Sequence, residues 1–535
     1  MPMYRDFVPR AVRPWLYVVL AFCFQLSGCV YLGAMNNQIG ERCWMREDVL
    51  MCLYCTLIGM AIYFPVLFRM KFHFSNKFLL CTAALVVMAC NLLTLLPLPL
   101  PVVWAVCVVC GMAKIQGTFE CMSNIQLWMT PQRDFAVFFP LLHIVLLTSI
   151  EVSGFLAAEW AFTAHWSLMH WFVCGLMLFV LAVQLALTRP FHAMPQRIPL
   201  KGIDWFGCLL WIALCLQVTY VLNYGDWLDW WHSPRIRLLC GTSLLTLAVC
   251  LQRMWNHPQP YLEPAIWGYR HMVPIVVLIG VVEVLFSCEH VLEMVCYEEV
   301  MHYADHVYER LNQWSLPGIW AGCLFALGWL KVMQWNVYKL IAVGLCAFTV
   351  YAAGFYLLIA PSLNIEAFRL PLLFRGFSYA VLCIAFMRAL HAIMSFQHFF
   401  QALCIFNMLH MFVGGLVGAA LHARGLNYYV GEGFARYSGW LSDVLLSRQP
   451  FDFAGFMDGF VQQMLAKSVK TLYGWTLYAA LFFALLMLLW DIPGVRRQVK
   501  HMQTWPRVGL QVMGSFRRQQ RLRRIRHQRA EALRR

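Results

Sequence analysis

A lysine and a glutamate interrupt one apolar stretch of the sequence, CGMAKIQGTFECMSN, which runs from Cys110 to Asn124. On a helix, Lys114 and Glu120 would lie about 9 Å apart along the axis and about 600° apart around it. We therefore expect no direct pairing between them, and each needs a partner on another helix.

The other ionisable residues in apolar runs are the candidate partners. They are His143, Glu151, Glu283, Arg375 and His410. An ionised side chain at the centre of a bilayer costs at least about 2.5 kcal/mol, so each group should face a partner or a wet cavity. A desolvated carboxylate can bind and release protons near neutral pH, which is the chemistry that couples transport to a proton gradient. The alternative is that these residues form structural pairs that lock helices together.

The composition indicates that membrane-spanning helices must position these residues. With 61% hydrophobic and 13% charged residues, the chain of 535 residues has too little polar surface for the several soluble domains that its length would allow. The first apolar run, Pro14 to Met35, is long enough to cross a hydrocarbon layer of about 30 Å, and it lacks a signal-peptide cleavage site. We expect an all-α polytopic membrane protein.

Apolar runs of about 20 residues predict fourteen spans. The spans begin near residues 14, 48, 77, 101, 135, 166, 203, 237, 271, 311, 336, 369, 399 and 470. Polar and proline-bearing breaks divide the chain into a six-helix bundle (1–190), two linker spans (191–255) and a second six-helix bundle (256–492). A long outward loop in the second bundle, 423–468, is expected to be partly helical and to pack on the membrane surface.

Most of the net charge of +15 lies in the tail, residues 493–535. After Asp491 the chain has 13 lysines and arginines but one acid, Glu531. A basic block directly after a span is typical of contact with anionic lipid headgroups, so we expect lipid and no nucleic acid as its partner. Basic residues in alternate loops predict that both termini are cytoplasmic.

Cysteines and histidines predict neither a metal site nor a cofactor. The 21 cysteines lie mostly in apolar runs, where thiols behave as small hydrophobes, and the C-x-x-C pairs that begin at Cys52 and Cys107 fall inside predicted spans. In CEHVLEMVCYEEVMHYADH, His302 and His306 could share a helical face, but no second ligand cluster accompanies them. This segment is expected to be a solvated acidic outer loop.

Two motifs flank the predicted seventh span, GIDWFGCLLWIALCLQVTYVLNYGDWLDWWHSPRI. They resemble the D-W-x-G and G-x-x-x-D-W motifs of the fourteen-span drug:proton antiporters of the EmrB/QacA type, in the major facilitator superfamily. The matching residues are Asp204, Trp205, Gly207, Gly225, Asp229 and Trp230.

Weaker matches to the same family extend from about Pro14 to Asp491. AKIQGTFE resembles the fourth span, with Lys114 in place of an arginine, and TPQRDFAVFF resembles the loop that follows it. SIEVSG falls on the antiporter motif of the fifth span, LPLLFRGFSYAVLCIAF on the twelfth span and MFVGGLVGAAL on the glycine-rich thirteenth. The matching residues are Gln116, Gly117, Arg133, Gly154, Arg375, Gly376, Gly414 and Gly415.

This resemblance implies the major facilitator fold, two six-helix bundles plus two central helices, with a site between two halves that rock. It also implies proton-coupled export of amphipathic or lipophilic small molecules across the cytoplasmic (inner) membrane. In a Gram-negative cell, such proteins work with a periplasmic adaptor and an outer-membrane channel.

Two departures from the family pattern leave alternatives open. The loop after the second span, FRMKFHFSNKF, has no aspartate, and only Gly154 remains of the motif in the fifth span. The first alternative is an uncoupled uniporter or sensor of the same fold. The second is a membrane-embedded lipid-modifying enzyme with His143 and His410 as bases.

Overall fold

The computed structural model describes residues 3–130, 134–192, 199–360, 363–446 and 453–489, and every regular element in these ranges is a helix. Of the described helices, thirteen are long and apolar enough to cross a membrane, and α1 is a shorter apolar helix. These fourteen helices match the fourteen predicted spans in order, so the expected all-α polytopic architecture is confirmed. The basic tail, 493–535, lies outside the described residues.

The first eight spans form the N-terminal bundle and the linker. The bounds are α1 (Val12–Leu26), η1 (Leu32–Ala34), α2 (Met35–Arg42), α3 (Arg46–His73), α4 (Asn76–Thr94), α5 (Leu100–Met129), α6 (Phe135–Thr163), α7 (Leu168–Leu187), η2 (Leu200–Gly202), α8 (Trp205–Tyr224), η3 (Trp230–His232) and α9 (Pro234–Asn256).

The last six spans form the C-terminal bundle, and three of them contain π-helical turns. The bounds are η4 (Pro264–Gly268), α10 (Met272–Phe286), η5 (Glu289–Glu293), η6 (Cys296–Val300), α11 (Asp305–Asn312), α12 (Ser315–Leu327), η7 (Gly328–Val332), α13 (Val337–Leu358), η8 (Ile365–Phe368), α14 (Arg369–Ile393), α15 (Phe396–Leu409), η9 (His410–Gly418), α16 (Ala419–Leu446) and α17 (Phe453–Leu489).

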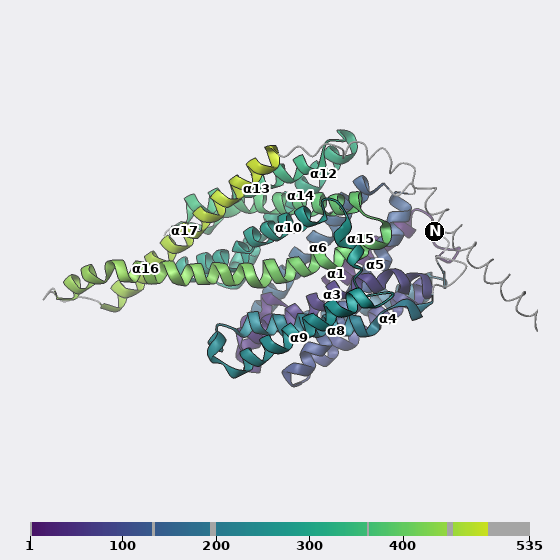
Figure 1. The fold of residues 1–535 in the computed structure, drawn as a ribbon, viewed down its shortest axis with the longest axis horizontal. Coiled ribbons are helices and arrows are strands. Elements are labelled where there is room, and N and C mark those ends of the chain that lie inside the picture. The colour runs from purple at the N-terminus through teal and green to yellow at the C-terminus, as the bar shows by residue number, and fades with distance from the viewer. Residues whose placement is uncertain (1–2, 131–133, 193–198, 361–362, 447–452, 490–535) are drawn as a thin grey trace, which may run out of the picture. The chain divides into compact units, whose positions relative to one another are not determined.

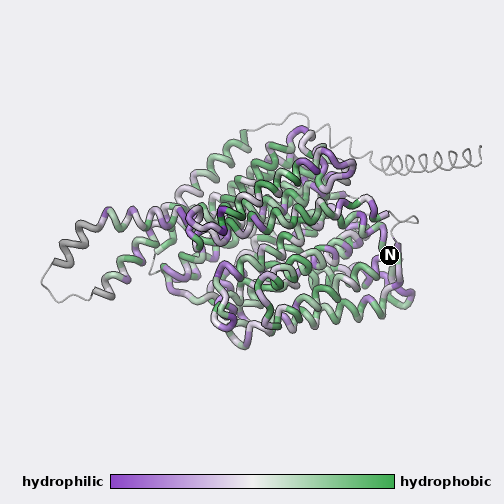
Figure 2. The backbone as a smooth tube through the Cα atoms, turned by 60° about the horizontal axis from the view of Figure 1, so that its bottom comes forward, coloured by the Kyte–Doolittle hydropathy of each residue, from purple (hydrophilic) through white to green (hydrophobic). Residues whose placement is uncertain are grey.

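Polar residues begin several spans and apolar residues continue them. The side chains of Ser75, Asp134, Asp204 and Asn336 accept hydrogen bonds from backbone N–H groups in the first turns of α4, α6, α8 and α13. Such caps satisfy the N–H groups that a helix leaves free at its start. Figure 2 shows hydrophobic residues along the middle of the helices and hydrophilic residues at many of the turns. A bilayer requires this distribution, because its hydrocarbon core offers no water to polar groups and the backbone must form its hydrogen bonds within each helix.

The same close helix packing occurs once in each half. A Cβ atom on Gly111 of α5 would lie 2.0 Å from the carbonyl oxygen of Thr56 on α3. A Cβ atom on Gly376 of α14 would lie 2.1 Å from the carbonyl oxygen of Ser315 on α12. Spans two and four therefore pack at backbone contact, and spans ten and twelve repeat this arrangement, although the sequence shows no repeat.

The two halves meet along two seams, α6 against α12 and α3 against α15 (Figure 1). Near the start of α6, the ring of Phe135 lies 3.9 Å from that of His391 on α14. On the other seam, the rings of Phe68 and Phe119 lie 6.1 and 5.3 Å from that of Phe400. Aromatic side chains therefore close the space between the halves at this end.

The linker spans lie at the edge of the helix assembly. α8 packs against α9, α3 and η9, whereas only 11% of the apolar part of α9 is buried. The two helices are therefore central in the chain but peripheral in the fold.

Helices occupy most of the predicted outward loop 423–468. α16 continues the thirteenth span without a break. α17 is the next helix in the chain, and it contains the fourteenth span. The two helices pack on each other, since the rings of Phe434 and Phe460 are 5.3 Å apart and Trp475 donates a hydrogen bond to Tyr429. Figure 1 shows this α16–α17 hairpin extending past the ends of the neighbouring helices.

Candidate functional site

A buried arginine on α14 lies between acidic residues of the ninth span. Arg375 donates a hydrogen bond of 2.7 Å to Oε2 of Glu293, and both side chains are only 4% exposed. The Arg375 guanidinium is also 3.4 Å from Oε1 of Glu289. The hydroxyl of Tyr351 on α13 donates to the other oxygen of Glu293. Arg375 therefore lies within ion-pair distance of two carboxylates on one helix.

The backbone of the ninth span positions these carboxylates. Beyond Phe286, the helix continues as the π-helical segments η5 and η6, and Glu289 and Glu293 are the first and last residues of η5. Wide turns of this kind are rare in helices and occur often at functional sites. Because the two glutamates are one turn apart, both can reach the same guanidinium.

Two more carboxylates approach this arginine from other helices. Glu151 on α6 and Glu309 on α11 each interact electrostatically with Arg375 and Glu289. A Cβ atom on Gly154 of α6 would lie 3.8 Å from Oε2 of Glu309. Two carboxylates thus pair with one guanidinium and two more interact with it electrostatically, one of the four from the N-terminal half and three from the C-terminal half; we call Glu151, Glu289, Glu293, Glu309 and Arg375 the central cluster.

A second ionisable pair lies earlier in the ninth span, before Glu289. Nδ1 of His410 on η9 is 2.8 Å from Oε2 of Glu283 on α10. A Cβ atom on Gly414 would lie 2.8 Å from the same carboxylate oxygen, so a larger residue there would displace the Glu283 carboxylate. His290 interacts electrostatically with both this pair and the central cluster, so it links the two groups of ionisable side chains.

Exposure differs strongly within this group of side chains. The Glu289 side chain is 33% exposed and the His410 side chain is 37% exposed, in contrast to the buried Arg375 and Glu293. These ionisable groups therefore include both buried and partly exposed side chains.

The structure brings together four of the seven predicted candidates. Glu151 and Arg375 belong to the central cluster, and Glu283 and His410 form the adjoining pair. In contrast, His143 is buried and contacts the carbonyl oxygen of Phe139 on its own helix.

The remaining two candidates are the charges in CGMAKIQGTFECMSN, and they have separate partners. Glu120 accepts a hydrogen bond of 2.6 Å from the Asn76 side chain and pairs with Lys71 at 3.3 Å. Lys114 donates a hydrogen bond of 2.6 Å to the carbonyl oxygen of Ser27, just beyond α1. Lys71 and Asn76 belong to the loop FRMKFHFSNKF, so Glu120 joins that loop to α5 in the absence of an aspartate.

The residues of the seventh-span motifs have structural contacts. Asp204 caps α8 through the N–H of Gly207 and accepts two hydrogen bonds from Arg253 on α9. Burial opposes ionisation of Asp204, but these bonds outweigh it and hold its pKa below the usual value. Trp205 is exposed as the first residue of α8.

The exit of the seventh span is a tight turn. Asp229 and Trp230 have positive φ angles of 56° and 43°. The turn folds the indole of Trp230 over Gly225, where a Cβ atom would lie 2.8 Å from the ring.

The other family-pattern residues lie mainly at helix contacts. Gly117 faces the ring of Phe24, and the backbone oxygen of Gly415 accepts a hydrogen bond from Tyr54. Gln116 is buried, and neither its amide nitrogen nor its amide oxygen has a hydrogen-bond partner among the described residues. Arg133 lies outside the described residues.

Part of the central cluster was not predicted, because the sequence of residues 288–306 indicated an outer loop. That boundary was wrong: one candidate span extends from Met272 to Val300, with Glu289 and Glu293 inside it. The i, i+4 spacing of these two acids was the available signal. The possible helical face of His302 and His306 was also wrong, because His302 has a φ of 57° and α11 begins only at Asp305.

Comparison with solved structures identifies the fold. An auto-inhibited peptide transporter of the POT family has 14% identity and a TM-score of 0.53 over 90% of this chain and 98% of that chain. A proton-dependent oligopeptide transporter has 11% identity and a TM-score of 0.54 over 89% and 98%. A variant of the nucleoside transporter NupG has 13% identity and a TM-score of 0.50 over 89% and 99%.

These similarities confirm the predicted major facilitator fold. At such low identity they concern the fold alone. No family model matches the sequence, and no curated protein matches it.

Proposed function

We propose that this chain is a proton-coupled secondary transporter of the major facilitator type, which moves small molecules by alternating access. The observation that carries the proposal is the central cluster, four carboxylates around one arginine where the two halves of the fold meet. In transporters of this kind, substrate and ion sites lie between the halves near the bilayer midplane.

The charge balance of the cluster favours proton binding. If all four carboxylates were ionised, one guanidinium would have to balance four negative charges in a poorly hydrated space. Uncompensated buried charges are costly, and such groups take up protons instead. Glu289 and Glu293 are the proton acceptors that we propose, because the two carboxylates share one guanidinium.

The exported substrate that we propose is amphipathic or lipophilic. This rests on the resemblance to drug:proton antiporters of the EmrB/QacA type, in particular on the two motifs around α8. A second candidate is a peptide, since the cluster offers both charge signs and a zwitterionic peptide carries both. The peptide transporters of similar fold support this candidate.

We further propose that the protein resides in the cytoplasmic membrane with both termini in the cytoplasm, as the basic residues of alternate loops predict. In that orientation the α16–α17 hairpin faces outward. In a cell with an outer membrane, this hairpin is the surface that we assign to a periplasmic adaptor. The contact of the tail with anionic lipid also stays a prediction.

The test is transport in proteoliposomes with an imposed pH gradient, using a panel of lipophilic cations, amphiphiles, dipeptides and nucleosides. We expect at least one compound to move against its gradient in the parent. The variants Glu289→Gln and Glu293→Gln should lose this accumulation. They should still exchange labelled for unlabelled substrate, because exchange needs no net proton movement.

The matched control is Glu366→Gln. Glu366 is in an ion pair of 2.7 Å with Arg369, but this pair is exposed at the start of α14. Its variant should transport as the parent does. Equal movement with and without the pH gradient would favour the uncoupled uniporter, and no movement of any compound would argue against transport.

A further inference from the structure

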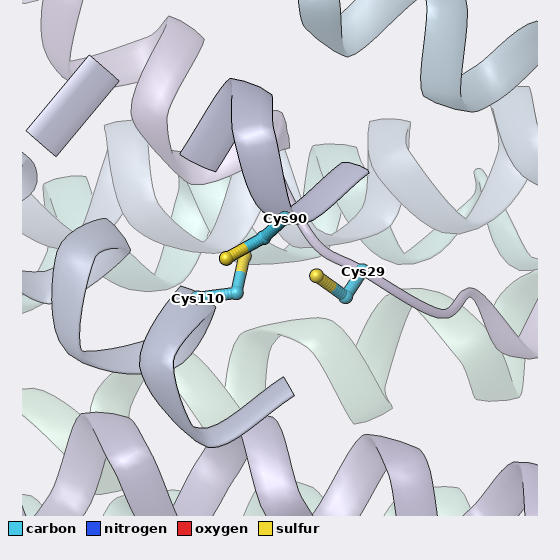
Figure 3. A group of neighbouring side chains, drawn as sticks. All are labelled: Cys29, Cys90 and Cys110. Carbon is cyan, nitrogen blue, oxygen red and sulfur yellow. The ribbon is translucent and has the colours of Figure 1, made fainter. Parts of the chain in front are cut away.

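Three buried thiols from distant parts of the sequence converge inside the N-terminal half. Cys29 follows α1, Cys90 lies on α4 and Cys110 lies on α5, and all three are buried. Their sulfur atoms lie within 4.8 Å of one another. Figure 3 shows the three side chains pointing toward a common point. We call these residues the thiol triad.

The convergence extends to further thiols in the same core. Cys29 also contacts Cys107, one turn before Cys110 on α5, and Cys107 contacts Cys52 on α3. Cysteines that serve only as small hydrophobes have no reason to select one another as neighbours. Thiolates, in contrast, are ligands for soft metal ions.

A cation is present beside the triad. Lys114 is four residues after Cys110 on the same helix, and it interacts electrostatically with Cys110 and Cys29. Among the described residues, its hydrogen-bond acceptor is the Ser27 carbonyl oxygen at 2.6 Å, and no carboxylate pairs with it. An ammonium group in this position would compensate the negative charge that metal-bound thiolates carry.

We propose that the thiol triad binds one Cu(I) ion. Zn²⁺ in buried sites takes four ligands in a tetrahedron, whereas among the described residues only three sulfurs, those of the triad, all lie within 4.8 Å of one another. Cu(I) is soft and is satisfied by two or three thiolates. On binding, each ligating thiol releases its proton to the solvent, and no oxidant or reductant is needed. With three thiolates bound, the Lys114 ammonium reduces the net charge of Cu(I) and the sulfurs from −2 to −1.

Bound copper would fasten the segment after α1 to α4 and α5. Residues 27–31 form no helix and connect the first span to η1. A ligand from this segment and two from helices give the ion a structural role in the N-terminal half. This role is independent of the proposed transport.

The test is an anaerobic titration of the reduced full-length protein in detergent with Cu(I), in competition with a chromophoric Cu(I) chelator. We expect one ion per chain, with only sulfur ligands by X-ray absorption. The variants Cys90→Ser and Cys110→Ser should bind it about 100-fold more weakly or worse, since even loss of a group outside the ligand shell costs about 10- to 100-fold. Lys114→Gln should bind Cu(I) about 10-fold more weakly than the parent.

The matched control is Cys174→Ser, which removes a buried thiol of the same half from α7, outside the triad. This variant should bind as the parent does. The parent alone already tests the proposal, so a variant that fails to fold does not leave it open. Absence of tight binding, equal loss in the Cys174 variant, or a preference for Zn²⁺ with four sulfur ligands would each overturn it.

Discussion

Removing Arg375 alone should harm the protein more than removing it together with its partner. Arg375 and Glu293 are both 4% exposed and are 2.7 Å apart. At an effective dielectric constant of about 20, two charges at this separation attract by roughly 6 kcal/mol, which offsets the cost of burying them. In Arg375→Met, Glu293 keeps its burial but loses this attraction. We expect a loss of about 3–5 kcal/mol in the free energy of unfolding.

The double variant Arg375→Met/Glu293→Gln removes both charges of the pair. It should recover much of the lost free energy, which gives a coupling on the order of 2–3 kcal/mol in a double-mutant cycle. Denaturant-induced unfolding in mixed micelles, followed by tryptophan fluorescence, measures each variant. The chain contains 22 tryptophans, which makes this signal strong.

A second cycle supplies the control. Arg369 and Glu366 are also 2.7 Å apart, but their side chains are 44% and 57% exposed. Solvent screens such a pair, so its coupling should be about 1 kcal/mol or less. If the two cycles give equal coupling, the reasoning is refuted, because burial would then not determine the strength of the Arg375 pair.

Three further predictions concern other parts of the fold. Gly111→Ala should prevent correct packing of α5 on α3, because the added carbon would lie 2.0 Å from a backbone oxygen, whereas Gly175→Ala on α7 meets no atom within 4 Å and should express normally. Asp204→Asn should be less thermally stable than the parent at neutral pH. Because the pKa of Asp204 is lowered in the fold, its contribution is present above the unfolded value of 3.8, and the difference should vanish as the pH falls further below that value. Glu120→Gln should lower stability but leave the pH dependence of transport unchanged, since its partner is Lys71 and not the central cluster.

Each of these predictions has a contradicting result. Equal expression of the two alanine variants would show that α3 and α5 are not at backbone contact. A stability difference at Asp204 that does not shrink at all as the pH falls below 3.8 would exclude the ionised carboxylate as its cause. Loss of proton-driven accumulation in Glu120→Gln would make this residue part of the coupling pathway.

Hydropathy was sufficient to predict the spans, because a bilayer requires a similar length and an apolar surface from every span. Each of the fourteen apolar runs is a helix in the structure, whereas the major facilitator fold was predicted from the resemblance of the motifs. The end of the ninth span was not predictable in this way. Its last turns contain Glu289 and Glu293, two acids that are typical of a solvated loop. Their charge partner, Arg375, is more than 80 residues away in the sequence, and only the fold brings it close to them.

The thiol triad was beyond sequence reasoning for a related reason. Cys29, Cys90 and Cys110 have no metal-ligand spacing, and two of them lie in separate spans. Only helix packing brings them together, and the sole local hint was Lys114, a charge in an apolar helix without a carboxylate partner. Lys114, which replaces an arginine of the motif that this stretch resembles, is thus the residue that lies beside the unexpected cluster.

The central cluster combines two carboxylates that differ in access but compete for the same guanidinium. Glu293 is buried and is also held by Tyr351, whereas Glu289 is one-third exposed and lies 3.4 Å from Arg375. Under the proposed proton coupling, a proton bound by one of the two glutamates leaves Arg375 to the other. We infer that this exchange of partners is the step that senses the proton. Because Glu151 of α6 interacts with the same guanidinium, the change would reach the seam between the two halves, along which the proposed alternating access would occur.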